Sequence, residues 1–323
     1  MADPEILDFD HGISAVDARF KRPGMAAIHL IAEGQRAALV DIGTNYSVPQ
    51  AEKLLKHRGI APENIAYLIV THVHLDHAGG AGAMLARLPQ AQLVVHPRGA
   101  RHMADPSQLV AGATAVYGET EMRASYGELI PIPQERILQT HDGLTLDIGG
   151  RSLVFLDTLG HCRHHHCIYD ERSGGIFTGD NFGISYRQLD VAGRPCVIPA
   201  TAPVQFDPEA YHRSVDRILA LRPRWAFMTH FSRVGELQRL GQDLHRLLDG
   251  HVAVAKTAQG TSGTERHGII TTGLRKLFLD YVRQRSCTLP EAEIDALFAL
   301  DVEVNAQGVE VWMDRPPKME RGS

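Results

Sequence analysis

Four side chains of the kind that bind metals stand within six residues, directly after a short apolar segment. The segment IAYLIV at 65–70 is typical of a strand buried on both faces, and it leads into His72, His74, Asp76 and His77. Residues two apart in extended backbone point the same way, so His72 and His74 can reach one point. Asp76 and His77 follow as the chain turns toward a helix and can reach a neighbouring point. The pattern predicts a site for a pair of divalent metal ions.

Three further candidate ligands stand at the ends of strand-like segments downstream. His161 follows SLVFLDTLG, Asp180 follows GGIFTG, and His230 follows RWAFMT. Strand ends are rigid, and a metal site needs ligands that are held in place. A carboxylate such as Asp180 can also offer one oxygen to each of two ions. We therefore expect these three residues to complete the site.

Strand-like and helical segments alternate along most of the 323 residues, which predicts a layered α/β fold. The proline-containing segment at about 97–135 breaks the alternation and is interpreted as an insertion that covers a site. From residue 251 the chain becomes polar and glycine-rich, so we expect a linker there, then two helices and a β-hairpin over 301–314. This divides the chain into a catalytic domain at 1–250 and a C-terminal extension at 251–323 that packs on it.

Composition and charge narrow the classes of partner. A net charge of −5 and a pI of about 6.4 argue against binding to nucleic acid or to an anionic membrane surface. No apolar stretch approaches the ~20 residues that span a bilayer, and the first residues do not resemble a signal peptide. Four cysteines in a chain of this length suit a reducing compartment. We expect a cytoplasmic protein that acts on a small molecule, with a homodimer left open.

The motifs resemble those of the metallo-β-lactamase superfamily of metal-dependent hydrolases. The resemblance covers about residues 25–235, and it is nearest to an uncharacterised archaeal and bacterial branch close to the lactonases and glyoxalase II. It implies an αββα sandwich with the metals at one edge of two facing sheets, here with a helical insertion and a C-terminal helix-hairpin extension. The segments that carry it are Thr71 to His77, Gly160-His161, Thr178-Gly179-Asp180 and Thr229-His230, with Asp41-Ile42-Gly43 as the family's acidic turn.

The resemblance also implies a role for each ligand. His72, His74 and His161 would bind one metal, the second would be held by the remaining three, and Asp180 would bridge the two. Zinc would be the preferred metal, and iron and manganese are alternatives that bind to the same side chains. The nucleophile would be a metal-bound hydroxide, and Asp76 would orient it or pass a proton to the leaving group. The second metal's own ligands would be Asp76, His77 and His230.

The sequence departs from the family around the third metal histidine. Lactonase-like and glyoxalase-like members read T-P-G-H-T-x-G-H, whereas this chain reads TLGHCRHH at 158–165. The wall of the site therefore differs, and neither lactone nor glutathione-thioester specificity is transferred. His165, which stands in place of the second histidine, and Asp41 are candidates for supporting the ligands from behind. Tyr186 is a candidate for hydrogen bonding to a substrate carbonyl or oxyanion.

These features favour a binuclear metallohydrolase that cleaves an ester, a lactone or a thioester. Two alternatives stay open. The first is an iron-dependent oxidoreductase of the same fold, related to sulfur dioxygenases or diiron proteins, which oxygen uptake would reveal. The second is a small-molecule binding protein with negligible turnover, which would be stabilised by its ligand without forming product.

Overall fold

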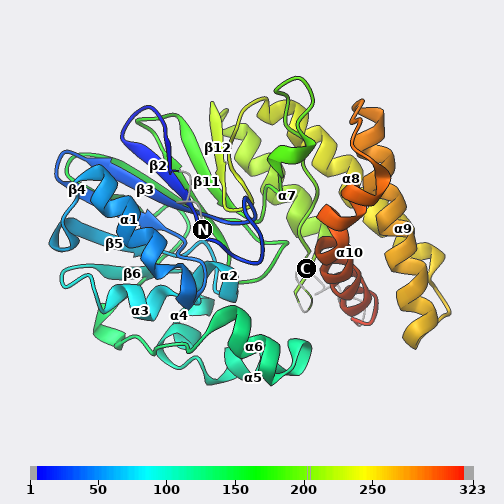
Figure 1. Cartoon of the computed structure of the whole chain (residues 1–323), viewed down its shortest axis with the longest axis horizontal. Helices are drawn as coiled ribbons and strands as arrows, with labels where there is room; N and C mark the ends of the chain where they lie inside the picture. The colour runs from blue at the N-terminus through cyan, green and yellow to red at the C-terminus, as the bar shows by residue number, and fades with distance from the viewer. Residues whose placement is uncertain (1–5, 202, 204, 316–323) are drawn as a thin grey trace, which may run out of the picture.

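The computed structural model describes residues 6–201, 203 and 205–315, in which two β-sheets lie face to face between outer layers of helices (Figure 1). This confirms the αββα sandwich that the resemblance implies. Within the described ranges, no helix combines the length and apolar character that a bilayer crossing needs.

The first sheet has seven strands in chain order, and its last four are parallel. The second has six strands in the order β13-β12-β11-β10-β9-β8 and is antiparallel except where β11 pairs with β12. The first sheet comprises β1 (Ile6–Asp8), β2 (Ile13–Asp17), β3 (Ala27–Glu33), β4 (Arg36–Val40), β5 (Ile65–Ile69), β6 (Gln92–Val95) and β7 (Ile137–Gln139). The second comprises β8 (Thr145–Asp147), β9 (Ser152–Asp157), β10 (His166–Asp170), β11 (Gly175–Gly179), β12 (Trp225–Met228) and β13 (Ser232–Val234).

Apolar side chains fill the space between the sheets. Phe177 and Phe227 stack with their ring centroids 4.8 Å apart. On β5, Ile69 belongs to this inner core, whereas Leu68 belongs to the core beneath the helices. Successive residues of a strand point to opposite faces, so a strand covered on both sides is apolar throughout. This accounts for the unbroken apolar segment before the histidines.

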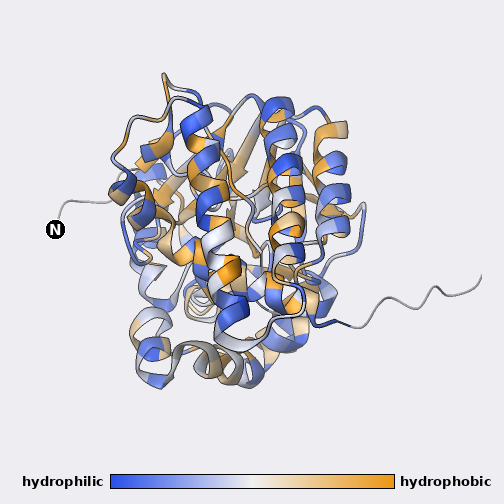
Figure 2. Cartoon of the chain, turned by 90° about the vertical axis from the view of Figure 1, so that its right-hand side faces the viewer, coloured by the Kyte–Doolittle hydropathy of each residue, from blue (hydrophilic) through white to orange (hydrophobic). Residues whose placement is uncertain are grey.

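Helices cover both outer faces of the sandwich. The first sheet carries α1 (Val48–Arg58) and α3 (Ala81–Leu85), and the second carries α7 (Pro208–Ala220), α8 (Leu237–Thr257), α9 (Gly263–Gln284) and α10 (Glu291–Met313). Hydrophilic and hydrophobic residues alternate along the helices on the side of α9 and α10 (Figure 2), as expected when each helix buries one face.

The insertion between β6 and β7 is helical. It contains α4 (Pro97–Ala104), α5 (Ser107–Tyr117) and α6 (Glu119–Tyr126), which together form the lower layer in Figure 1. Met122 and Tyr126 anchor it in the core of the first sheet.

The predicted hairpin at 301–314 is wrong, because this segment is the second half of α10. Alternating valines around Asn305 and Gly308 suggested two strands, but the buried residues Ile294, Phe298, Asp301 and Val309 recur at helical spacing. Packing against α9 and α8 overrides the local β preference. The predicted boundary at residue 250 lies inside α8, and the linker is reduced to 258–262. The division into two domains stays a prediction.

The arginine of a buried ion pair in the second sheet also links this sheet to the first. Arg151 donates through Nε to Asp170 Oδ1 at 2.9 Å, and both side chains are fully buried. Its Nη1 donates to the backbone oxygens of His11 at 2.6 Å and Ala32 at 3.1 Å, in the opposite sheet.

We predict that Arg151→Met lowers the free energy of unfolding by about 3–5 kcal/mol, because it leaves Asp170 buried without a cation. The double variant Arg151→Met/Asp170→Leu should recover part of this loss. Lys276→Ala, which removes the exposed pair with Asp280, should cost no more than about 0.5 kcal/mol. Denaturant unfolding measures all three, and an equal loss at both sites would contradict the assignment.

His267 on α9 lies between two carboxylates of α10. Its Nε2 is 3.1 Å from Glu303 Oε2 and its Nδ1 is 3.3 Å from Glu310 Oε2. Carboxylates only accept, so both ring nitrogens must carry protons. Partial burial works against the charge, but Glu310 and Glu303 raise the pKa of His267 above its ordinary value.

Because the folded-state pKa is raised, the stabilisation is present below pH ~6.5, the unfolded value, and is lost as pH rises through the folded value. His267→Gln should therefore lower the melting temperature at pH 6 and have little effect at pH 9. His267 and its two glutamates are partly exposed, so the loss in the free energy of unfolding should stay below about 1 kcal/mol. His141→Gln, at an exposed site in another part of the chain, is the control, and an effect of His267→Gln that grows with pH would refute the interpretation.

Candidate metal centre

The structure brings all seven predicted ligands together at one edge of the sandwich. Four of them stand in the connection from β5 into the short helix α2 (Leu75–Ala78). The other three follow strands of the second sheet: His161 lies between β9 and β10, Asp180 follows β11, and His230 lies two residues after β12.

Local backbone geometry explains this convergence. His74 is extended, with φ −67° and ψ 150°, and caps α2, so Asp76 and His77 fall in the first helical turn. Glycines precede two of the other ligands where the chain passes close to its neighbours. A Cβ on Gly160, whose φ is 132°, would lie 2.3 Å from Tyr211 Cα, and one on Gly179, whose φ is 47°, would lie 2.5 Å from His165 Nε2. Only glycine fits at either position.

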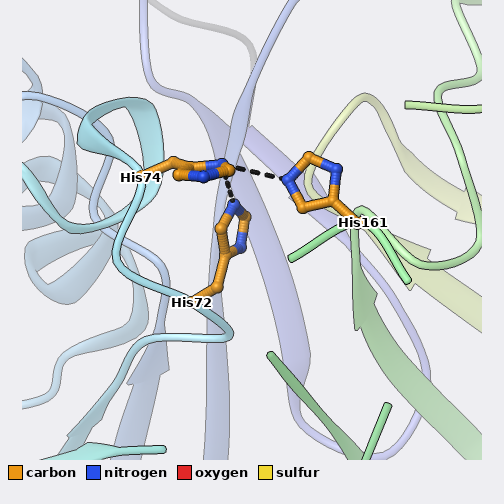
Figure 3. A group of neighbouring side chains, drawn as sticks. All are labelled: His72, His74 and His161. Atoms are coloured by element: carbon orange, nitrogen blue, oxygen red, sulfur yellow. Dashed lines mark hydrogen bonds between the residues drawn. The ribbon is translucent and has the colours of Figure 1, made fainter. Parts of the chain in front are cut away.

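His72, His74 and His161 form a first group (Figure 3). His74 Nδ1 lies 2.9 Å from His72 Nε2 and 3.0 Å from His161 Nε2. His161 Nδ1 donates to the carbonyl oxygen of Ala200 at 2.8 Å, which leaves a lone pair on its Nε2. Burial lowers the pKa of all three histidines, so they are neutral, as metal ligation requires.

Asp76, His77 and His230 form a second group. His230 Nε2 lies 3.4 Å from Asp76 Oδ2 and 3.3 Å from His77 Nε2. The other nitrogen of each ring is anchored: His230 Nδ1 donates to the Met25 carbonyl at 2.6 Å, and His77 Nδ1 to Asp41 Oδ2 at 2.8 Å. When the two rings are neutral, both Nε2 atoms present lone pairs to one point. Burial opposes charge on His77, but the surrounding aspartates raise its pKa well above the ordinary value, so a metal ion that binds here would displace the Nε2 proton.

Asp180 lies between the two groups. Its Oδ1 is 3.2 Å from His77 Nε2 and its Oδ2 is 3.5 Å from His161 Nε2. Although burial alone would raise the pKa of Asp180, the neighbouring histidines hold it well below its usual range. Oδ1 is buried, and among the described residues it has no hydrogen-bond donor. A charged, buried and unmatched oxygen facing several nitrogen lone pairs fits a divalent cation.

The structure places both predicted supporting residues behind ligands. Asp41 accepts from the Thr71 backbone N–H, from the hydroxyls of Thr71 and Thr229, and from His77. His165 accepts the backbone N–H of Asp180 on Nε2 at 3.2 Å, and its Nδ1 contacts Thr158 Oγ1 at 2.9 Å.

Sequence reasoning missed other residues that hold the ligands. The Asn181 side chain accepts the backbone N–H of His161 at 3.0 Å, and the Tyr211 hydroxyl donates to the backbone oxygen of Asp180. Asn181 adjoins a ligand and was detectable by position. Tyr211 comes from α7, and no local pattern marks it. Cys162 lies 3.2 Å from His164 Nδ1, and burial raises the pKa of its thiol well above the ordinary value, so it stays protonated.

Tyr186 is fully buried, and its hydroxyl donates to Asp301 Oδ1 of α10 at 3.1 Å. A hydroxyl has one proton, so it cannot also donate to a substrate carbonyl while this bond is kept. The predicted contact with substrate would require the Tyr186 proton to leave Asp301.

A cavity of about 650 Å³ lies over the ligands. His74, Asp76, His161, Asp180 and His230 line it at the metal end, and residues of α4, α5, α6 and α10 line the remainder. A small molecule in this cavity would contact the site directly.

The model of the metallo-beta-lactamase superfamily matches residues 22–230, and the chain belongs to this superfamily. A metallo-beta-lactamase fold-containing protein of the archaeon Sulfurisphaera tokodaii, ST1585, is 25% identical over 68% of this chain and 77% of its own length. Its crystal structure superposes with a TM-score of 0.62 at 20% identity, covering 93% of this chain and 98% of that one.

Several relatives are named as thioesterases. Acyl-coenzyme A thioesterase MBLAC2 of Gallus gallus is 28% identical over 52% of this chain and 62% of its own length. Thioesterase pkgB of Emericella nidulans is 25% identical over 55% of this chain and 44% of its own length. The chain thus spans less than two thirds of either relative. Together with the superfamily, these names support an enzyme of the hydrolase class that binds divalent metal.

We predict that His74→Ala and Asp180→Ala each lower the metal content and remove the stabilisation that added zinc gives to the native protein. Metal that binds only the folded state raises the melting temperature, so loss of ligands reduces this rise. Elemental analysis, thermal unfolding and far-UV circular dichroism measure metal, stability and fold. His141→Ala is the control. Native metal content in Asp180→Ala would contradict the ligand assignment.

Proposed function

We propose that the chain is a binuclear metallohydrolase of the class that cleaves esters, lactones and thioesters. Within this class, we propose that its own substrate is a thioester. The observation that carries this proposal is the pair of ligand groups that share Asp180, whose unmatched Oδ1 faces one group and whose Oδ2 faces the other. We infer two ions, zinc first, with iron and manganese accepted by the same donors.

Divalent ions bound here would lower the pKa of a bound water toward neutrality and would polarise the substrate carbonyl. The protein's own contribution is to fix the donors before substrate arrives. The Nδ1–H groups of His161 and His230 each donate a hydrogen bond to a backbone carbonyl, so neither ring can turn away from the site. The Asp180 backbone is held by His165 and Tyr211. Such preorganisation costs no rearrangement at the moment of reaction.

Asp76 is the best-placed group to orient the attacking water. Its side chain is 23% exposed, and it lines the cavity. Burial alone would raise the pKa of Asp76, but His77 and His230 lower it below the ordinary value. A carboxylate that stays ionised accepts a hydrogen bond from water and is a weak proton donor to a leaving group. Asp76 therefore orients water, and water or substrate groups protonate the departing thiolate or alkoxide.

The thioester is favoured over the other bonds by the names of the thioesterase relatives. Their partial coverage leaves the whole activity of this chain as a proposal. The altered sequence at 158–165, where His164 stands in place of the family's Gly and Cys162 in place of its Thr, argues for a wall different from that of glyoxalase-like members.

We predict metal-dependent release of free thiol from acyl thioesters by zinc-loaded protein. Asp76→Asn should lower kcat by on the order of 10²-fold, because the attacking water is no longer held in position. Metal content is measured in the same samples, because Asp76 is also a ligand. His141→Gln is the matched control. Thiol release unaffected by chelation would contradict the proposal.

Two other outcomes would replace this proposal with the alternatives. Oxygen uptake by iron-loaded protein, with no thioester cleavage, would indicate an oxidoreductase. Thermal stabilisation by a thioester or lactone without product would indicate a binding protein.

A further inference from the structure

Two helices that are far apart in the sequence form apolar walls of the cavity over the metal ligands. Leu109, Gly112 and Ala113 of α5 line it, as do Leu300 and Val304 of α10. Residues three and four apart lie on one face of a helix, so each set is a continuous face turned to the cavity. Figure 1 shows α5 in the insertion and α10 at the C-terminal end of the described chain.

These faces remain exposed although they are apolar. Leu300 is 37% exposed, one of the few large apolar side chains of the described residues with that much contact with water. Leu109 and Val304 are half-buried. An exposed apolar wall that continues into a site with convergent polar groups is typical of ligand cavities.

Besides histidines, the charged side chains that line the cavity are Lys21, Asp76, Arg101, Glu121, Asp180 and Asp301. Lys21 is paired with Glu121 and also donates to Ser125 Oγ at 2.7 Å. Asp76 and Asp180 stand at the metal end. Asp301 accepts a hydrogen bond from the hydroxyl of Tyr186. Beside Gln108, Asp301 and Asn305, the other lining residues of α5 and α10 are apolar, and this apolar part suits an uncharged hydrocarbon group.

We propose that α5 and α10 bind the hydrocarbon acyl chain of the substrate. This inference rests on the proposed function and names the substrate more closely: a thioester of a medium-length or long acyl chain. The thiol half of a coenzyme or carrier thioester is polar, so only the acyl half matches an apolar wall. The acyl chain would lie between the insertion and the C-terminal helix, with its carbonyl at the metal ligands.

Chain length is the first test. We expect kcat/KM for acetyl, hexanoyl and decanoyl thioesters of N-acetylcysteamine to rise with length, by up to roughly fourfold for each methylene removed from water. The zinc-loaded full chain is used. A flat series would contradict the inference.

Gly112→Phe tests the α5 wall. A Cβ at Gly112 meets no heavy atom within 4 Å, so a ring can enter the cavity without displacing the backbone. The ratio of kcat/KM for decanoyl over acetyl should fall by about tenfold, which corresponds to roughly two buried methylenes. Gly268→Phe is the matched control, because this exposed glycine on α9 has the same open surroundings and lies away from the cavity lining.

Leu300→Gln tests the α10 wall and is a milder change, should Gly112→Phe fail to fold. The same ratio should fall, whereas Val311→Gln should leave it unchanged. Val311 lies on the same helix, is 36% exposed and is absent from the cavity lining, so it is closely matched. Equal effects of the two substitutions would overturn the inference.

Binding of decanoate, measured by calorimetry against acetate, separates this inference from the proposed function. If no thioester is cleaved but decanoate binds and Leu300→Gln weakens it, the hydrolase proposal fails and the acyl site stands. If thioesters are cleaved but kcat/KM does not depend on chain length and neither Gly112→Phe nor Leu300→Gln changes the decanoyl-to-acetyl ratio, the acyl site fails and the hydrolase proposal stands.

Discussion

The carboxylate of Asp41 is the contact on which the geometry of the site depends. It is fully buried. It accepts hydrogen bonds from Thr71, in the segment that follows β5, and from Thr229, in the segment that follows β12. It also accepts from His77, a ligand. One side chain therefore fixes the two sheets against each other at the edge where the ligands meet. Because a buried carboxylate is costly unless its oxygens are matched, this arrangement tolerates little displacement of either sheet.

The convergence of the candidate ligands was predictable because it follows from short-range geometry. A strand buried on both faces, an extended dipeptide and a helix start were enough to bring His72, His74, Asp76 and His77 to one edge. His161, Asp180 and His230 were identifiable only in combination, through their positions after strands. Tyr211 was not predictable, since α7 reaches Asp180 only after the second sheet and its helices have packed.

The C-terminal segment shows where local patterns mislead. The valines around Asn305 alternate as in a hairpin, and only the contacts of α10 with α8 and α9 make the segment helical. The error conceals that Leu300 and Val304 lie about one helical turn apart on the part of α10 that lines the cavity. The insertion was predicted from its prolines, and its contribution to the cavity depends on how α5 lies over the site. The proposed acyl site thus lies in the two regions with the weakest local patterns, while the proposed metal ligands lie in the strongest.

The number of metal ions per chain tests the central claim most directly. His212 and His245 form a separate surface pair with their Nδ1 atoms 2.6 Å apart, so the measurement is best made in a His212→Ala background. Elemental analysis of protein purified without added metal should give about two ions per chain, falling clearly when Asp180 is replaced by alanine. One ion or none in protein with Asp180 intact, or two ions that persist without Asp180, would contradict a centre built on two ligand groups that share this carboxylate.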